Sequence, residues 1–251
     1  RITMVFACFA LVSMAVSAQT AKIALQHNGN VTLFDSDKRT DALEASVDGD
    51  TLYLNEGTFG GNFTIAKKVS IIGSGVNTVL SGAVTVSIPN TPTLTSHLLD
   101  ALNMQSSIKI TLPMKGLKIR KCQFVGLSFD ALVEDITIDR CYSRGNYSYP
   151  LRLSNNVKRM NVINSKIYSL TGSAEYAGDV NFVNCNFYQL YNYMSSNSCK
   201  ATYMNCIICY WYYTQSSHDS STTYVNCLCG TNSYSYSVNQ NCWNYGKTNI
   251  I

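Results

Sequence analysis

Charged side chains are scarce in this chain of 251 residues, because Lys, Arg, Asp and Glu together make up only 14% of it. About a quarter is usual for a soluble protein. The formal net charge is +4, which is too small to predict binding to nucleic acid or to an anionic membrane surface. Tyr, Asn and Ser take the place of the missing charges, as expected of a long, neutral polar surface.

Long apolar runs are also missing, apart from one at the N-terminal end. Residues 2–16 are mostly apolar and follow Arg1, and Val16-Ser17-Ala18 has the small residues of an export-signal cleavage site. A membrane-spanning helix needs about 20 apolar residues. We therefore expect a signal peptide over residues 1–18, no transmembrane segment in the mature chain, and a secreted, periplasmic or cell-surface protein. A lipoprotein that uses Cys8 is the less favoured alternative, because the apolar run continues past it.

Cysteine is absent between Cys8 and Cys122 and then occurs nine times. In an exported chain cysteines often form disulfides, but nine is an odd number and the spacing follows another rule. Five of the cysteines are separated by 19, 44, 21 and 21 residues, and Ser165 holds the equivalent place within the gap of 44 (Cys122, Cys141, Cys185, Cys206, Cys227). The cysteines therefore mark a repeat of about 20 residues.

The residues around each Cys or Ser position predict how one repeat folds. Apolar residues occur five and three places before it (Leu117 and Ile119, Ile136 and Ile138, Met160 and Val162, Val180 and Phe182, Ala201 and Tyr203). This alternation predicts a strand with one buried face. Inward residues resume two places after it (Phe124, Ser143, Ile167, Phe187, Ile208, Cys229). The phase has slipped by one residue, which a straight strand cannot absorb, so a bend must directly precede each Cys position.

The residue at the bend is asparagine in most repeats (Lys121, Arg140, Asn164, Asn184, Asn205, Asn226, Asn241). Asparagine enters the left-handed region more readily than any residue but glycine, so we expect a positive φ at each bend. The earlier stretch "KKVSIIGSG" places Gly73 at the equivalent bend, where glycine meets the same demand. Like residues would then stack from coil to coil, as a ladder of asparagines beside a ladder of cysteines.

These features predict an all-β fold, a single-stranded right-handed parallel β-helix (solenoid). Neighbouring cysteines about 4.8 Å apart lie within the Cα range of a disulfide, but parallel Cβ vectors fit that bond poorly. We favour free, buried thiols, with disulfides as the alternative. The C-x-x-C pair Cys206 and Cys209 is interpreted as part of the repeat, because no βαβ pattern surrounds it.

Residues 48–82 resemble the first coils of a known superfamily. Gly49-Asp50-Thr51, the segment from Leu52 to Phe59 and the segment from Lys67 to Gly75 are similar to the Gly-Asp-Thr start, the L-x-L-x-x-G-T-F/Y strand and turn, and the K-x-V-x-I-I-G-x-G stretch of the pectin-lyase-like right-handed β-helix proteins. The resemblance continues through the Asn-Cys coils to about Cys242. It implies the fold but no single activity, because this scaffold hosts lyases, hydrolases, esterases, adhesins and inert spikes.

The catalytic patterns of that superfamily's enzymes are missing. Their chemistry needs clustered carboxylates, as an acid/base pair or as calcium ligands beside a cationic base. After Cys141 only three acidic residues remain, each in a different coil (Glu175, Asp179, Asp219), and none of the three histidines has the neighbours of a polygalacturonase or pectate-lyase motif (His27, His97, His218). The pectin-methylesterase Gln and Asp motifs are absent too. We therefore predict no catalytic residue, no metal site and no cofactor.

Two polar clusters allow a functional interpretation and a plainer one. Glu134, Asp135 and Asp139 share a coil with Arg140 and Arg144. These residues could form a cation or sugar site on a single coil, but we favour a solvated loop with ion pairs. His218-Asp219 is a base with its orienting partner or, as we favour, a polar turn.

The ends of the chain predict the domain limits. Residues 19–48 are expected to form an N-terminal cap, with a strand over 30–34 and a short amphipathic helix over 38–46 that covers the first coil. The β-helix then spans residues 49–251. Within the less regular stretch 84–113, residues 88–107 are predicted to form a loop beside one coil. No capping element follows Cys242, so we expect either a chain truncated at its C-terminus or an end that docks onto something else.

Tyrosine is nearly absent from the first half of the chain, since only Tyr53 of the 17 tyrosines precedes Cys141. Seven aromatic residues fall five to nine places after the Cys position of their coil (Tyr191, Tyr193, Trp211, Tyr212, Tyr213, Tyr234, Tyr236). Stacked coils would align them as a stripe, which suits sugar rings, unless the rings shield one another.

We therefore hypothesise a secreted or cell-surface, non-catalytic module that binds a polysaccharide, a cell-surface glycan or another surface through this stripe. One alternative is a polysaccharide lyase or glycoside hydrolase with an unrecognised site. The other alternative is a purely structural repeat segment of a larger surface protein.

Overall fold

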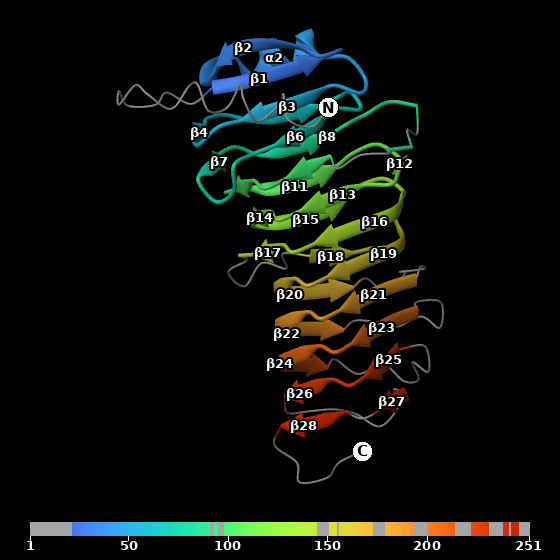
Figure 1. Ribbon diagram of the computed structural model, residues 1–251. Helices are drawn as coiled ribbons and strands as arrows, with labels where there is room; N and C mark the ends of the chain where they lie inside the picture. Colours follow the sequence, from blue (N-terminus) through green and yellow to red (C-terminus); the bar gives the residue numbers. More distant parts are fainter. Residues whose placement is uncertain are drawn as a thin grey trace.

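The computed structural model describes residues 22–90, 93–94, 98–144, 151–154, 156–172, 179–192, 200–213, 222–230, 238–240 and 242–245. Over these residues the chain forms an almost all-β parallel solenoid with one short α-helix near its N-terminal end. Successive coils stack along one long axis, from the blue end to the red end of Figure 1. The predicted all-β parallel β-helix with a short N-terminal helix is confirmed. No helix among the described residues is long and apolar enough to cross a membrane.

The first sheet takes one strand from each coil and adds two antiparallel strands at its N-terminal end. Its order is β2 (Asn30–Asp35), β1 (Lys22–His27), β3 (Thr51–Leu54), β6 (Ser70–Ile72), β9 (Leu99–Asp100), β13 (Lys118–Arg120), β16 (Val133–Asp139), β19 (Val157–Ile163), β21 (Asp179–Val183), β23 (Lys200–Met204), β25 (Thr222–Val225) and β27 (Val238–Gln240), with β12 (Met114–Lys115) also paired to β16. Ile119, Ile138 and Val162 form one inward row of parallel strands and are fully buried, as the alternation predicts.

The second sheet uses two short strands per coil in the N-terminal half. One series is β4 (Gly57–Phe59), β7 (Thr78–Leu80), β10 (Asn103–Met104), β14 (Gln123–Phe124) and β17 (Tyr142–Ser143), and the other is β5 (Phe63–Ile65), β8 (Val84–Val86), β11 (Ser107–Ile110), β15 (Gly126–Phe129) and β18 (Leu151–Leu153). Strand β20 (Lys166–Gly172) pairs with β17 through its first residues and with β18 through its last. The later strands of this sheet are β22 (Asn186–Asn192), β24 (Ile207–Tyr213), β26 (Leu228–Gly230) and β28 (Trp243–Tyr245).

The N-terminal end of the solenoid carries the hairpin β1–β2, the 3₁₀ turn η1 (Ser36–Lys38) and helix α2 (Arg39–Ala45). The last carbonyls of a helix have no partner within it, and here the Nζ of Lys67 donates to the carbonyls of Leu43, Glu44 and Ser46 at 3.1, 2.6 and 2.6 Å. The strand and helix predicted for this region are confirmed. Strand β1, which pairs with both β2 and β3, has no counterpart in the prediction.

A left-handed residue forms the corner before each described Cys position, as predicted. The φ angles lie between 51° and 54° (Lys121, Arg140, Asn164, Asn184, Asn205, Asn226), and Asn241 lies outside the described residues. The asparagine side chains also form a hydrogen-bonded ladder: Nδ2 donates to the Oδ1 of the preceding coil at 3.1, 3.2 and 3.3 Å (Asn184 to Asn164, Asn205 to Asn184, Asn226 to Asn205).

The reason given for Gly73 is wrong, because this glycine does not have a positive φ. Its N–H does make the corner hydrogen bond, to the carbonyl of Asp100 at 2.9 Å. A Cβ at this position would lie only 2.3 Å from the carbonyl oxygen of Ala101 and 2.8 Å from a methyl group of Leu102. The close approach of the next coil therefore requires glycine here. Ala101 itself takes the left-handed conformation in that next coil, with φ at 54°.

The loop predicted for residues 88–107 is partly wrong. From Leu99 onward this stretch supplies strands β9 and β10 in register with the coils on both sides, and Leu98, Leu99 and Met104 are buried. Strands β9 and β10 of this coil are only two residues long, so the alternation of apolar and polar residues is too short to be recognised in the sequence.

The cysteine ladder lies inside the corner. Five cysteines at this position are free, buried thiols (Cys122, Cys141, Cys185, Cys206, Cys227), and Cys242 is buried as well. In the first five of them the Sγ donates to the carbonyl two residues earlier at 3.2 to 3.4 Å. Ser165 makes the same contact through its Oγ at 2.7 Å. A small, mostly apolar side chain with one donor fits this corner, which explains both the cysteines and the single serine.

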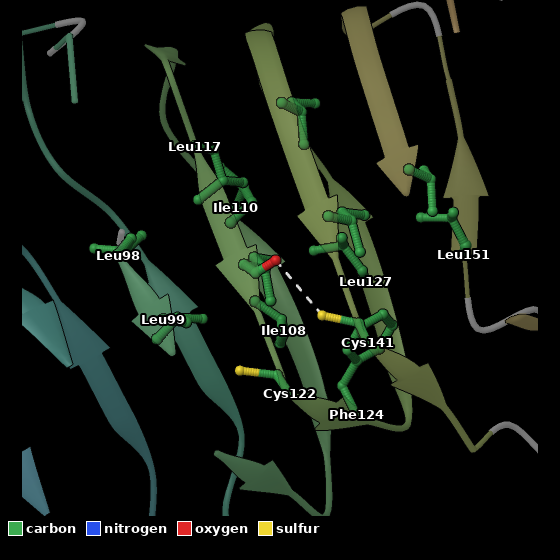
Figure 2. Close-up of a cluster of buried hydrophobic side chains, with 14 of the residues drawn as sticks. Leu98, Leu99, Ile108, Ile110, Leu117, Cys122, Phe124, Leu127, Cys141 and Leu151 are labelled. Atoms are coloured by element: carbon green, nitrogen blue, oxygen red, sulfur yellow. Dashed lines mark hydrogen bonds between the residues drawn. The ribbon is translucent and has the colours of Figure 1, made fainter. Parts of the chain in front are cut away.

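The core around this ladder is tightly packed. In Figure 2 the side chains of Cys122 and Cys141 lie among Ile108, Phe124 and other buried residues, and the dashed line marks the bond from Cys141 to the Ile119 carbonyl at 3.5 Å. In later coils the interior rows become aromatic: neighbouring rings stack at 4.8 and 4.9 Å between centroids (Phe182 on Tyr203, Tyr203 on Tyr224). Like residues therefore stack on like inside the solenoid as well as at its corner.

Candidate functional site

Three of the seven predicted binding residues, Tyr193, Tyr234 and Tyr236, lie outside the described residues. The other four are placed by the strand register. Tyr191 pairs with Thr171 in β20 and with Tyr212 in β24, and Thr171 in turn pairs with Arg152, whose side chain is exposed. Tyr191 and Tyr212 thus share one row of the second sheet.

The remaining two predicted residues fall on other rows. Trp211 pairs with Leu190, which pairs with the buried Leu170, and Tyr213 pairs with Asn192. The predicted stripe is therefore spread over three adjacent rows of β22 and β24. The binding role of these residues stays a prediction.

The structure brings together an aromatic patch that the sequence analysis missed. Tyr142, Lys166, Tyr168 and Tyr188 form this patch on the outer side of the second sheet. The rings of Tyr168 and Tyr188 stack at 4.8 Å between centroids with an interplanar angle of 30°. The Nζ of Lys166 lies 5.4 Å from the centre of the Tyr142 ring, within the range of a cation–π contact.

The positions of these side chains follow from the corner. After each Cys or Ser position the first and third residues point outward and the second points inward, so Lys166 and Tyr168 flank the buried Ile167. Tyr142 and Tyr188 are 37% and 40% exposed, which leaves ring surface available to a ligand. The missed signal was the tyrosine at these first and third places, because the predicted stripe uses only the aromatic residues five to nine places after the Cys position.

The outward row of Tyr142 and Lys166 continues along the solenoid without a carboxylate. It runs through Asn186, Ile207 and Leu228 by strand register, and the last two side chains are 42% and 37% exposed. Strands β17, β20, β22, β24 and β26 contain no Asp or Glu, and Lys166 is their one charged residue. This surface is therefore amphipathic and nearly neutral, with a slight positive bias.

The acidic residues Glu134, Asp135 and Asp139 lie in strand β16 and not in the predicted loop. They are engaged in ion pairs, as the favoured interpretation expects. Arg159 donates to Glu134 at 2.7 Å and to Asp135 at 2.5 Å, and Lys115 lies 3.4 Å from Asp135. The hydrogen bonds from Arg159 lower the pKa of both carboxyl groups and, reciprocally, raise the pKa of the guanidinium. All three side chains are accessible to solvent, so the pairs contribute little to stability.

A second left-handed position creates this cluster. Gly116, Asp135 and Arg159 all have positive φ, at 83°, 56° and 52°, and each lies next to a register pair of neighbouring coils. The extra residue turns Asp135 and Arg159 to the same outer side as Glu134. The sequence analysis did not identify this second bend, because an acidic and a basic residue occupy it in place of asparagine.

The other two arginine residues near this cluster do not join it as a common site. Arg140 pairs with Asp139 at 2.8 Å. Arg144 donates to the side-chain oxygens of Gln123 and Asn103. Together with the pairs above, these contacts support the interpretation as surface ion pairs and hydrogen bonds.

Asp100 and Arg120 form the most buried ion pair on the outer side of the first sheet. Asp100 is 4% exposed, its Oδ2 accepts from the Nε of Arg120 at 3.0 Å, and its Oδ1 has no hydrogen-bond partner. The hydrogen bonds that Arg120 donates to Asp100 raise the pKa of Arg120. A cationic base must lose its proton in order to act, so this pairing opposes a lyase role for Arg120.

Metal-binding and thiol chemistry also find little support among the described residues. No group of three or more His, Cys, Asp or Glu side chains in that part of the chain is placed to hold a metal ion. Cys206 is buried and Cys209 is exposed, so the C-x-x-C pair points to opposite sides of its strand. His27 contacts the buried Asp50 at 2.7 Å, whereas His97 and His218 lie outside the described residues.

Comparison with known proteins adds no relative. No family model matches the chain, and neither a curated protein nor a solved structure gives a significant match.

Proposed function

We propose that this protein is a secreted or cell-surface, non-catalytic β-helix module that binds glycan through the outer side of its second sheet. The observation that carries the proposal is the aromatic patch, with stacked Tyr168 and Tyr188 next to the Lys166–Tyr142 contact. The proposal includes an export signal over residues 1–18 and membership of the pectin-lyase-like superfamily, both of which rest on sequence resemblance.

The chemistry of the patch fits a sugar chain better than a protein core. A tyrosine ring offers an apolar face for the C–H side of a pyranose and a hydroxyl for its polar edge. Lys166 and Asn186 add amine and amide hydrogen-bond groups on the neighbouring row. Because the coils repeat in register, a polymer lying along the solenoid would meet the tyrosine rings first and the exposed Ile207 and Leu228 further on.

The charge of the surface limits the classes of ligand that it can bind. With no Asp or Glu in its strands and Lys166 exposed, the patch has no group that repels an acidic sugar. A neutral or acidic glycan is compatible with it, whereas a cationic ligand gains nothing from Lys166.

A glycan-array screen, followed by affinity measurements and turnover assays on acidic polysaccharides, tests this proposal. Tyr188→Ala should weaken binding about tenfold, which corresponds to about 1.4 kcal/mol for an anchoring ring. Tyr212→Ala tests the row of Tyr191 and Tyr212 in the same way. Tyr53→Ala, which removes an outward tyrosine of the first sheet, is the matched control and should leave the affinity unchanged.

Three outcomes would contradict the proposal. Turnover of a polysaccharide would favour the enzyme alternative. Equal glycan affinity for the Tyr188→Ala protein and the unmodified protein would remove the patch from the binding surface, and no binding to any glycan would favour the structural alternative.

A further inference from the structure

Strand β2 is the last strand of the first sheet, and its outer edge has no strand partner among the described residues. Its side chains Val31 and Leu33 are 60% and 70% exposed, more than any other large hydrophobic residue in the described part of the chain. They pair with Gln26 and Ala24 of β1, so both lie on the same outer face of the sheet. The N-terminal end therefore presents an open strand edge next to exposed apolar surface.

This edge lacks the usual protection against pairing with another strand. Natural sheets guard their edges with Lys, Pro, bulges or very short strands. Residues Asn30–Phe34 contain no charged residue and no proline, and β2 is a regular strand of six residues. The one charged residue, Asp35, is at the far end and pairs with Lys22 of β1. An unprotected edge in an otherwise regular sheet is what an interface strand requires.

The strand is also complementary to itself. In an antiparallel pair of two β2 strands with Thr32 opposite Thr32 of the second copy, each Val31 faces a Leu33, and Asn30 faces Phe34. The two Asp35 residues then lie at opposite ends of the ribbon and do not repel each other. Such isologous pairing satisfies the free edges of both copies at once and buries the apolar pair of each.

We propose that two copies of this protein associate through their β2 strands, in antiparallel pairing centred on Thr32. The first sheet then runs without interruption through both solenoids, which extend away from a two-fold axis at their N-terminal ends. The aromatic patch of each copy stays free in this dimer, because it lies on the second sheet many coils away. Each dimer would therefore present two glycan-binding surfaces, if the proposed function holds.

Sedimentation equilibrium on the full chain, over a wide concentration range, tests the dimer. Val31→Lys and Leu33→Lys, made separately, should each raise the dissociation constant of the dimer at least tenfold. Each new Lys would face an apolar residue of the second copy, and the two symmetry-related Lys side chains would lie near each other across the two-fold axis and repel. Both side chains are largely exposed, so the variants should fold, which circular dichroism checks. Val76→Lys is the matched control, since Val76 is 56% exposed in the turn between β6 and β7.

A second measurement tests the register. In a Cys209→Ser background, which removes a thiol that is exposed in the described part of the chain, Thr32→Cys should form a disulfide-linked dimer on mild oxidation, whereas Asn30→Cys should not. A chain that stays monomeric at every concentration would overturn the proposal. It would do so even if residues 1–21 cover β2 and only their deletion exposes the strand. A dimer that survives both Lys substitutions would overturn it as well, whatever the result of the glycan assays.

Discussion

Replacing Asn184 by alanine tests the asparagine corner most directly. Asn184 has φ at 54°, donates to Asn164 at 3.1 Å and accepts from Asn205 at 3.2 Å. Alanine loses both hydrogen bonds, which are exposed and contribute about 0.5 kcal/mol each. It also adds about 1 kcal/mol of left-handed strain. We therefore expect Asn184→Ala to destabilise the protein by about 2 kcal/mol.

Asn184→Gly separates the two contributions, because glycine adopts the left-handed region without strain but cannot make the side-chain bonds. The alanine variant should lower the melting temperature by about 4–8 °C, and the glycine variant by about half as much. Differential scanning calorimetry gives the shift, and hydrogen exchange shows whether β21 and β23 open first. A glycine variant less stable than the alanine variant, or an alanine variant as stable as the unmodified protein, would refute the proposed role of the left-handed corner.

Three further predictions concern other parts of the solenoid. Gly73→Ala should cost about 1–3 kcal/mol through the contact with the Ala101 carbonyl, whereas Gly60→Ala, whose Cβ would meet nothing within 4 Å, should be near neutral in thermal unfolding. Lys67→Met should remove the three carbonyl contacts of helix α2 and raise hydrogen exchange there while β23 stays protected; equal exchange in both proteins would contradict this. Burial raises the pKa of Cys141 to about 12, so at mildly alkaline pH iodoacetamide should label Cys209 and leave Cys141 unmodified, as mass spectrometry of the peptides would show. Because the unfolded chain loses the Cys141 proton first, stability should fall as the pH rises above the ordinary thiol pKa towards 12, and a flat profile would contradict the burial.

Much of the fold was predictable because one local signal has one physical cause. The slip in phase before each cysteine requires a bend, and Lys121, Arg140 and the asparagines all take the left-handed conformation that a one-residue bend demands. The register of the coils then follows, since like residues stack.

Other elements escaped prediction for identifiable reasons. Strand β1 is followed by Asn28 and Gly29, which both have positive φ. This Asn-Gly pair is the signature of a two-residue hairpin, yet residues 22–27 before it were assigned to the cap without being predicted as a strand. Gly73 was assigned to the correct corner for a wrong reason, because close approach between coils is a tertiary effect that sequence alone does not reveal. Asp135 and Arg159 adopt left-handed φ at a second bend, and neither residue type signals such a bend in the sequence.

The candidate site was harder to predict than the fold. Which tyrosines point outward depends on the phase after the corner, and the patch of Tyr142, Tyr168 and Tyr188 follows from that phase once the corner is located. Tyr191, Trp211 and Tyr213 fall on three different rows of β22 and β24, because they lie six, five and seven places after the Cys positions of their coils.

The hydrogen-bonded asparagine corner has a consequence for how the gene can change. Asn184 and Asn205 each donate to the coil before them and accept from the coil after them. Duplication of one whole repeat of about 20 residues would therefore insert a coil that fits its neighbours, and would lengthen the solenoid by about 4.8 Å. Deletion of a repeat is equally mild, whereas gain or loss of a few residues within a strand would shift every rung beyond it. The length of the solenoid can therefore differ between related proteins while its cross-section stays constant.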